Sequence, residues 1–279
     1  MAKIVSAYGV PHTPSFVADV KARPNTETEQ HFKAVKRHMD QIKPDILVMI
    51  QNDHFNTFFL DNWPTFAIGI ATETSGPSDQ TPDMPIYNVP VAYGLARYLH
   101  KHCVNAGFDL SSSEKLTVDH AVLVPLHFLT PAMSIPIVPI FINCLVPPLP
   151  SAQRCFELGS AIRKGIGMWH ESARVSVIIS GSLSLEVGGP LMDVGKTFGV
   201  PNKAWAAWIL ECLDGVRHDE LVAAATPERM VQAGNVGGEL LNWIALLGLI
   251  GKVPPDLLIN QSELGNAFAA WRLNVGEAA

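Results

Sequence analysis

The chain has 279 residues, of which 48% are hydrophobic and 16% charged, and its formal net charge is −6. An average soluble domain has roughly 25% charged residues. The composition excludes intrinsic disorder, coiled coils and low-complexity scaffolds, because these need charge or repetition in place of core-forming residues. The sequence shows no basic cluster of the kind that nucleic-acid-binding proteins use. Its longest apolar stretch, residues 243–250, is less than half of a membrane span.

The amino-terminal residues and the cysteines favour a cytoplasmic location. The apolar residues 4–10 are followed by Pro11 and His12, which end the stretch too early for a secretory signal. No Cys-x-x-Cys spacing occurs, which favours buried thiols in a reducing compartment over disulfides or a zinc knuckle. The cysteines are Cys103, Cys144, Cys155 and Cys212.

Strand-like and helix-like patterns alternate along the chain. Apolar runs of strand length occur at residues 3–8, 45–51, 65–71, 135–143 and 174–180. Such near-continuous runs are typical of strands covered on both faces. Helical patterns lie at residues 26–42, 91–106, 151–170, 203–215, 219–225 and 237–250. This order predicts an α/β protein with a central mixed, mostly parallel sheet covered by helices on both faces.

The proline-rich segments do not divide the chain. Residues 75–90 and 146–150 are typical of long surface loops or lids. Because no internal repeat and no linker-like stretch occurs either, we predict that residues 1–279 form a single domain.

Two histidines directly follow predicted strands. His12 comes after the first strand and His54 after the second. In an open α/β sheet, groups at the carboxyl ends of strands point into the crevice where ligands bind. Either histidine alone is more typical of a turn or cap, because ten histidines are spread over the chain. Together they favour metal ligation.

Glu239 is the candidate for an acidic third ligand. It opens a strongly apolar helical pattern after the glycine-rich residues 233–238. An equally good interpretation is that it only complements the helix dipole, a contribution of about 0.3–1 kcal/mol. Two histidines and one carboxylate on three separate elements would form the facial triad that leaves positions on Fe(II) open for substrate and oxygen.

Two further segments carry polar groups into apolar surroundings. His120 follows Asp119, and its ordinary pKa near neutrality suits acid/base work, although a structural histidine is the commoner case. Residues 180–190 supply hydroxyl and backbone N–H groups after a predicted strand, as a pocket lining or as a tight polar turn. A nucleophilic serine there would lack the Gly-x-Ser-x-Gly elbow of hydrolases.

The other histidines are interpreted as solvated or structural: His31, His38, His100, His102, His127, His170 and His218.

Taken in order, these segments resemble the class III, LigB-type extradiol ring-cleavage dioxygenases, in particular the protocatechuate 4,5-dioxygenase β subunits and gallate dioxygenases. No single motif is decisive, but their joint occurrence in this order is specific, and the resemblance covers nearly the whole chain. The matching stretches are residues 9–14, 52–54, 64–69, 118–120, 124–126, 147–148, 154–156 and 237–240.

The resemblance implies roles for individual residues. His12, His54 and Glu239 match the family's ligands for non-haem Fe(II), and His120 matches a histidine beside the substrate. The family's usual acid/base histidine lies in a Gly-Gly-x-Ser-His-x-x-x-Gly-Pro motif. The corresponding residues 181–190 place Leu185 at that position.

Leucine cannot transfer a proton, so the standard mechanism needs another base, for which His120 and Glu186 are the candidates. Losing a general acid/base costs roughly 10²- to 10⁴-fold in rate, so reduced activity is expected rather than none. Three explanations stay open for Leu185: a natural subfamily, a deliberate substitution, or a protein that binds iron and ligand but turns over poorly.

We therefore expect Fe(II)-dependent, O₂-consuming cleavage of a catechol-like ring of the dihydroxybenzoate, gallate or aminophenol type. Ser184 and Glu186 are the expected substrate-binding residues, and Phe55 or Phe58 could add specificity. The alternatives are a zinc hydrolase that uses the same ligands, or a catalytically weak subunit that supports an active paralogue. The resemblance implies a homo-oligomer or a complex with a small α-type subunit.

Overall fold

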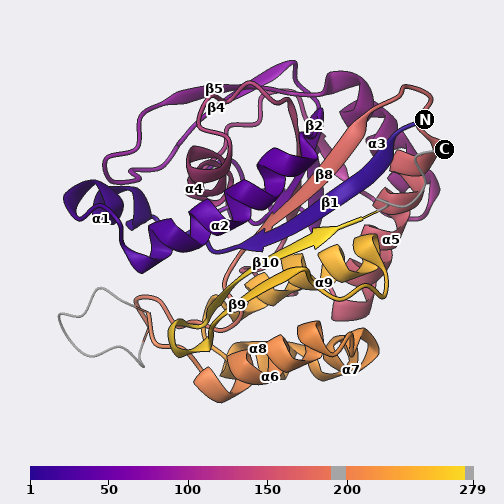
Figure 1. The fold of residues 1–279 in the computed structure, drawn as a ribbon. Coiled ribbons are helices and arrows are strands. Elements are labelled where there is room, and N and C mark those ends of the chain that lie inside the picture. Colours follow the sequence, from indigo (N-terminus) through magenta and orange to yellow (C-terminus); the bar gives the residue numbers. More distant parts are fainter. Residues whose placement is uncertain (190–198, 274–279) are drawn as a thin grey trace.

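An eight-stranded sheet in the order β6-β3-β7-β2-β8-β1-β10-β9 forms the centre of the fold (Figure 1). The computed structural model describes residues 1–189 and 199–273. The strands of this sheet are β1 (Lys3–Val10), β2 (Ile46–Gln51), β3 (Phe66–Gly69), β6 (Ser111–Ser113), β7 (Ile137–Ile142), β8 (Arg174–Ser180), β9 (Leu257–Gln261) and β10 (Asn266–Arg272). A separate antiparallel pair is made by β4 (Glu73–Gly76) and β5 (Tyr87–Pro90).

Parallel pairing dominates the middle of the sheet. Strands β7, β2, β8 and β1 are neighbours and all run parallel. The pairs of β3 with β7, β1 with β10 and β10 with β9 are antiparallel. The predicted mixed sheet is confirmed, and parallel pairs form a small majority of its described strand pairs.

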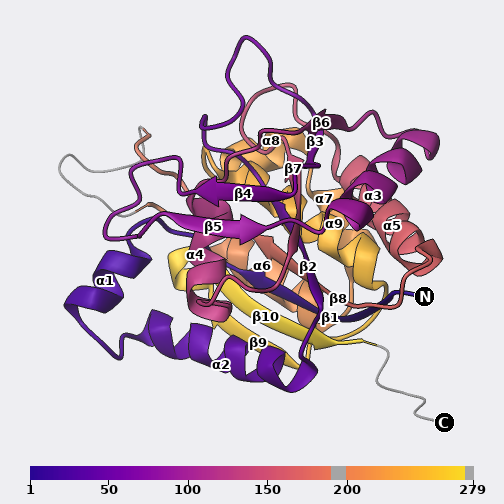
Figure 2. The same ribbon diagram turned by 90° about the horizontal axis from the view of Figure 1, so that it is seen from above.

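Helices cover both faces of the sheet (Figures 1 and 2). Helices α2 and α4 pack on one face, and α3, α5 and α9 pack on the other. The helices are α1 (Phe16–Ala22), α2 (Glu27–Ile42), α3 (Tyr93–Asn105), α4 (His120–Leu129), α5 (Ala152–Met168), α6 (Lys203–Asp214), α7 (His218–Ala224), α8 (Pro227–Gln232) and α9 (Leu240–Ile250). Two short 3₁₀ helices are η1 (Gly237–Glu239) and η2 (Ser262–Leu264).

The strongest sequence patterns correspond to observed elements. The five predicted strands are β1, β2, β3, β7 and β8, and the six helical patterns are α2, α3, α5, α6, α7 and the continuous η1–α9 segment. Residues 75–90 were expected to be loop throughout, but the β4–β5 pair occupies both ends of this segment. Buried Val89 explains this pairing, because it packs against the core.

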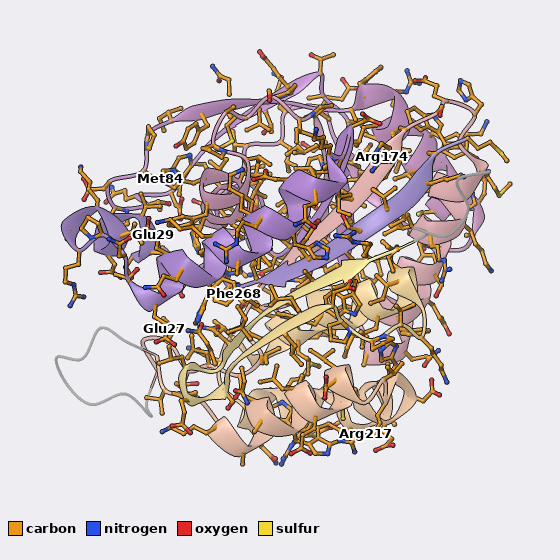
Figure 3. The ribbon with its side chains drawn as sticks, viewed as in Figure 1. Glu27, Glu29, Met84, Arg174, Arg217 and Phe268 are labelled. Atoms are coloured by element: carbon orange, nitrogen blue, oxygen red, sulfur yellow. The ribbon has the colours of Figure 1, made fainter. Side chains whose placement is uncertain are left out.

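The core is continuous on both sides of the sheet. Phe268 of β10 is fully buried, whereas Glu27 and Arg174 lie on the surface (Figure 3). All four cysteines are free and buried, as predicted. In the described part of the chain, no helix is long and apolar enough to cross a membrane. The single domain over residues 1–279 stays a prediction.

Candidate metal centre

Three neighbouring parallel strands end at the same edge of the sheet, and polar residues follow each of them. His12 lies after β1, His54 after β2, and Ser180 ends β8. Helix α4 begins at His120 and η1 ends at Glu239. Because the carboxyl ends of parallel strands form the ligand-binding edge of such sheets, these side chains gather there.

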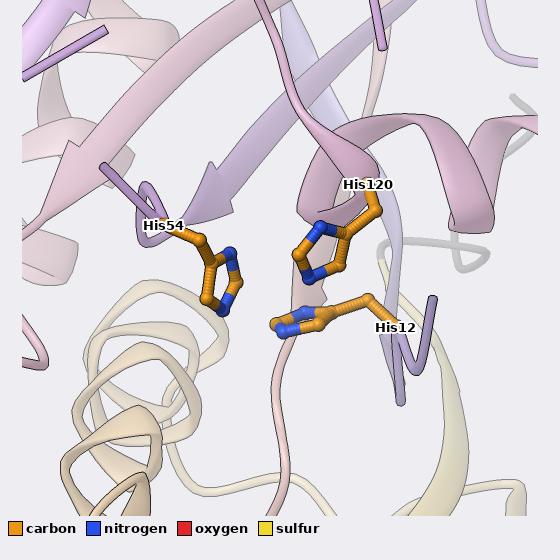
Figure 4. Close-up of side chains that lie close together, drawn as sticks. All are labelled: His12, His54 and His120. Atoms are coloured by element: carbon orange, nitrogen blue, oxygen red, sulfur yellow. The ribbon is translucent and has the colours of Figure 1, made fainter. Parts of the chain in front are cut away.

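Three imidazole rings face one point (Figure 4). Ring nitrogens of His12, His54 and His120 lie within 4.8 Å of one another. The His54 and His120 rings are stacked with their centroids 4.2 Å apart, and the His12 ring stands edge-on to both. His12 and His120 are buried and His54 is half-buried, so the cluster is largely shielded from solvent.

The Glu239 carboxylate belongs to the same cluster. Its Oε1 lies 3.1 Å from His12 Nε2 and 3.5 Å from His54 Nε2. Its Oε2 accepts hydrogen bonds from the backbone N–H and the hydroxyl of Ser182, at 2.6 and 2.8 Å. Burial alone would raise the pKa of Glu239, but the two histidines outweigh it and hold the pKa well below its usual range. Glu239 is therefore a fixed, buried anion.

The hydrogen bonds of His12 and His54 determine which ring nitrogen is free. Ser180 Oγ donates its proton to Ala121 O at 2.6 Å, so at 2.9 Å it accepts from His12 Nδ1. His54 Nδ1 lies 2.9 Å from the Asp119 carboxylate, which can only accept. Both protons are therefore on Nδ1, and in the neutral rings both Nε2 lone pairs face the Glu239 carboxylate.

Where both rings are neutral, the two lone pairs and the anionic oxygen favour a cation at this point, either a metal ion or a proton. Asn52 Nδ2, 3.1 Å from His54 Nε2, is a further donor there. Two ligands at about 2.1 Å from a metal and at right angles lie about 3.0 Å apart, close to the separations of Glu239 Oε1 from the two Nε2 atoms. Carboxylates and carbonyls that hold the outer nitrogen of a metal-bound imidazole are a general feature of metal sites. His12, His54 and Glu239 thus fit a metal ion, and His120 offers a further nitrogen.

The pKa of His54 also reflects neighbouring carboxylates that favour positive charge at this point. Burial alone would lower the pKa, but the carboxylates of Asp119 and Glu239 outweigh it and raise the pKa of His54 to about 10. In turn, His54 holds the pKa of Asp119 below its usual range against the opposing effect of burial. A proton takes the central position where a metal is absent, and metal binding displaces it.

His120 differs from its neighbours. Burial, together with the charge of His54, lowers its pKa, and its bond to Asp79 only partly opposes this. His120 is therefore neutral near pH 7. Its Nδ1 is hydrogen-bonded to Asp79 Oδ2, so its Nε2 is the atom left to face the cluster.

The segment with Leu185 contacts the cluster through Ser182, which binds Glu239. The Ser184 hydroxyl is fully buried, donates to Ala233 O at 2.8 Å and accepts from Asn202 N at 3.0 Å. The Glu186 carboxylate accepts from Asn235 N at 2.6 Å, and the Leu185 side chain lies against Gly199.

Among the hydrogen bonds of the described residues, none joins Ser184 or Glu186 to the three histidines. The roles expected for Ser184, Leu185 and Glu186 stay predictions. Pro190, which completes the motif, lies outside the described residues.

Several residues of the site carried no assigned role in the sequence. Ser180 and Ser182 lie in the segment that was expected to line a pocket. Asn52 Nδ2 lies 3.3 Å from Glu239 Oε1. Its position two residues before His54, after the same predicted strand, could have marked it as a residue of the site. Asp79 has no such signal, because a proline-rich loop brings it to His120 from 41 residues away.

Comparisons with known proteins concern nearly the whole chain. Residues 6–267 match the family model described as "Catalytic LigB subunit of aromatic ring-opening dioxygenase". A Paraburkholderia phymatum protein named 2,3-dihydroxyphenylpropionate/2,3-dihydroxicinnamic acid 1,2-dioxygenase is 30% identical over 270 residues, which cover 82% of each chain. A protein of the same name from Photorhabdus laumondii is 35% identical over 61% of this chain and 53% of its own.

A third relative, 2,3-dihydroxyphenylpropionate/2,3-dihydroxicinnamic acid 1,2-dioxygenase 2 of Pseudomonas putida, is 29% identical over 61% of this chain. In the last two matches the chain spans about half the length of the relative. Among solved structures, the uncharacterized protein JW3007 from Escherichia coli K12 has a TM-score of 0.65 at 13% identity, covering 96% of this chain and 99% of its own. That similarity supports the fold alone.

Proposed function

Because this chain belongs to the LigB family of aromatic ring-opening dioxygenases, we propose that it is an Fe(II)-dependent extradiol dioxygenase that inserts O₂ into a catechol-like ring and opens it. One observation carries the proposal: the Nε2 lone pairs of His12 and His54 converge on the carboxylate of Glu239. Two histidines and one carboxylate with open positions are the ligand set of non-haem Fe(II) oxygenases.

Each side chain has a distinct task in this proposal. His12, His54 and Glu239 hold the iron, which when bound supplies a template for the two ring oxygens and O₂ and lowers the pKa of the ring hydroxyls. His120 Nε2 accepts a proton from a ring hydroxyl and later returns it. The neighbouring Asp79 carboxylate stabilises the imidazolium that forms.

The position of Leu185 makes His120 the proton carrier. Leu185 has no titratable group, and Glu186 is bonded to the backbone of Asn235. The buried, neutral His120 ring is already in place beside the cluster. Ser184 and Glu186 are retained as candidates for shaping the substrate pocket through the turn that they stabilise.

The substrate is a catechol-like aromatic compound of the dihydroxybenzoate, gallate or aminophenol type. The names of the relatives add 2,3-dihydroxyphenylpropionate to this set. We further propose a cytoplasmic protein, in keeping with the four free thiols, that works as a homo-oligomer or with a small α-type subunit.

Oxygen uptake by iron-reconstituted protein across these compounds tests the function. We expect one compound class to give iron-dependent O₂ uptake together with the absorbance of its ring-opened product. Iron-loaded protein that consumes no O₂ with any of them would contradict the proposal, and tightly held zinc with ester or amide hydrolysis would favour the hydrolase instead.

A further inference from the structure

Asp79 makes a partly buried contact with the ring of His120 on the side away from the histidine cluster. The Asp79 Oδ2 atom is hydrogen-bonded to His120 Nδ1, and the two side chains are 20% and 8% exposed. The other carboxylate oxygen accepts a hydrogen bond from the Thr81 hydroxyl at 2.8 Å. Both oxygens of Asp79 are thus engaged, which fixes the carboxylate relative to the ring.

We propose that Asp79 is a positioning residue that sets the tautomer and orientation of His120. A carboxylate can only accept, so the His120 proton is held on Nδ1 and the Nε2 lone pair faces His12 and His54. In this state Nε2 can take a proton, whereas the opposite tautomer would present an N–H. The same logic orients the histidine of an Asp-His pair in hydrolases.

The loop that carries Asp79 is held in register with the start of α4. Ser78 N donates to Val118 O at 3.0 Å, and Val118 N donates to Ser75 O at 3.1 Å. A Cβ added to Gly76 would lie only 1.9 Å from Val118 O, so glycine permits this close approach. Since Val118 is two residues before His120, these bonds fix the distance between the loop and the ring.

The same loop offers a matched control. Asp83 lies four residues after Asp79 and forms an exposed ion pair with Lys21 at 2.6 Å. Asp83→Ala removes a carboxylate and a loop contact but leaves the His120 ring untouched. If Asp79 only holds the loop, Asp83→Ala should have the same effect as Asp79→Ala. If Asp79 orients His120, only Asp79→Ala should change the state of the ring.

The first experiment reads the tautomer in metal-free protein labelled with ¹⁵N-histidine, by NMR at neutral pH. The His120 signals are assigned by their loss in His120→Gln. We expect the Nδ1–H tautomer in the wild type and in Asp83→Ala, and a shift toward Nε2–H in Asp79→Ala. An Nε2–H tautomer in the wild type, or no change in Asp79→Ala, would overturn the proposal.

The second experiment rests on the proposed function and measures ring cleavage. In Asp79→Ala we expect kcat to fall roughly 10- to 100-fold, the typical effect of removing such a partner, while KM and iron content stay at wild-type values. Asp79→Asn keeps the volume and also lowers kcat, because a neutral amide cannot stabilise the imidazolium. Asp83→Ala should match the wild type.

The outcomes separate the two proposals. If the wild type cleaves no catechol, the proposed function fails, while the tautomer measurement still decides the role of Asp79. If kcat is unchanged in Asp79→Ala and Asp79→Asn, or if iron content falls in step with kcat, positioning of His120 is refuted.

Discussion

At the residue scale, each histidine of the cluster has its outer nitrogen engaged by an oxygen. Ser180 binds His12 Nδ1, Asp119 binds His54 Nδ1, and Asp79 binds His120 Nδ1. The three acceptors come from a strand end, a helix N-cap and a loop. They leave all three Nε2 atoms facing the same place, where His12 and His54 can bind a metal and His120 can exchange a proton.

Ser180→Ala should weaken metal binding without unfolding the protein. The substitution removes the acceptor that orients His12, so the iron dissociation constant should rise roughly 10- to 100-fold. The free energy of unfolding should fall by about 1–3 kcal/mol, because the buried Ala121 O and His12 Nδ1 both lose their partner. Iron titration under anaerobic conditions and denaturant unfolding give the two values.

Ser176→Ala is the control for this substitution. Ser176 lies on the same strand and is equally buried, but its hydroxyl pairs with Ser6 at 2.6 Å, away from the cluster. Ser176→Ala should also lower the free energy of unfolding and should leave the iron affinity unchanged. Equal iron affinities in the two variants would refute the orienting role of Ser180.

At the element scale, glycines allow α5 and α9 to pack in close contact on one face of the sheet. A Cβ added to Gly159 of α5 would lie 1.9 Å from Ala245 O, and one added to Gly248 of α9 would lie 1.9 Å from Phe156 O. Since Glu239 directly precedes α9, this contact also sets the depth at which its carboxylate meets the histidines.

Gly248→Ala should therefore destabilise the fold by about 1–3 kcal/mol, the usual cost of overpacking a core. Gly167→Ala is the control, because Gly167 lies on the exposed side of α5 and an added Cβ would meet nothing within 4 Å. It should stabilise the helix by up to about 1 kcal/mol. The free energies of unfolding of both variants, measured with denaturant, check the difference. An unchanged free energy of unfolding in Gly248→Ala would show that the two helices can move apart freely.

The elements that the sequence predicted are those with a continuous pattern. Strands such as β2 and β8 are uninterrupted apolar runs, and the buried positions of α2 recur with helical spacing. Strand β10 was missed because Ala267, Ala269 and Ala270 have low strand propensity, and tertiary pairing with β1 decides their conformation. Residues next to strand ends could be predicted as ligands, whereas Asp79 depends on loop packing that no local pattern encodes.

At the scale of the whole molecule, several histidines are buried or half-buried, and burial favours their neutral form. Burial lowers the pKa of His38, His120, His127 and His218 below the ordinary value of 6.5. His218 is 1% exposed, and neither of its ring nitrogens has a hydrogen-bond partner within the described residues. For each group the unfolded chain binds the proton more readily than the folded one.

Stability should therefore fall in acid. Above about pH 6.5 these groups are neutral in both states and their contribution is fully present, and it is lost as pH falls through the lowered folded-state pKa values. His218→Leu should make this decline smaller, which denaturant unfolding between neutral and mildly acidic pH will show. An identical decline in the variant would mean that His218 is not protonated on unfolding.

The most direct test of the metal centre is the iron content of protein loaded anaerobically with Fe(II) and freed of unbound metal. Wild type, Glu239→Gln and Glu186→Gln are compared, the last being a buried carboxylate bonded to Asn235 instead of the histidines. About one iron per chain is expected in the wild type and in Glu186→Gln, and little in Glu239→Gln. Full iron occupancy in Glu239→Gln would contradict the His12, His54 and Glu239 site.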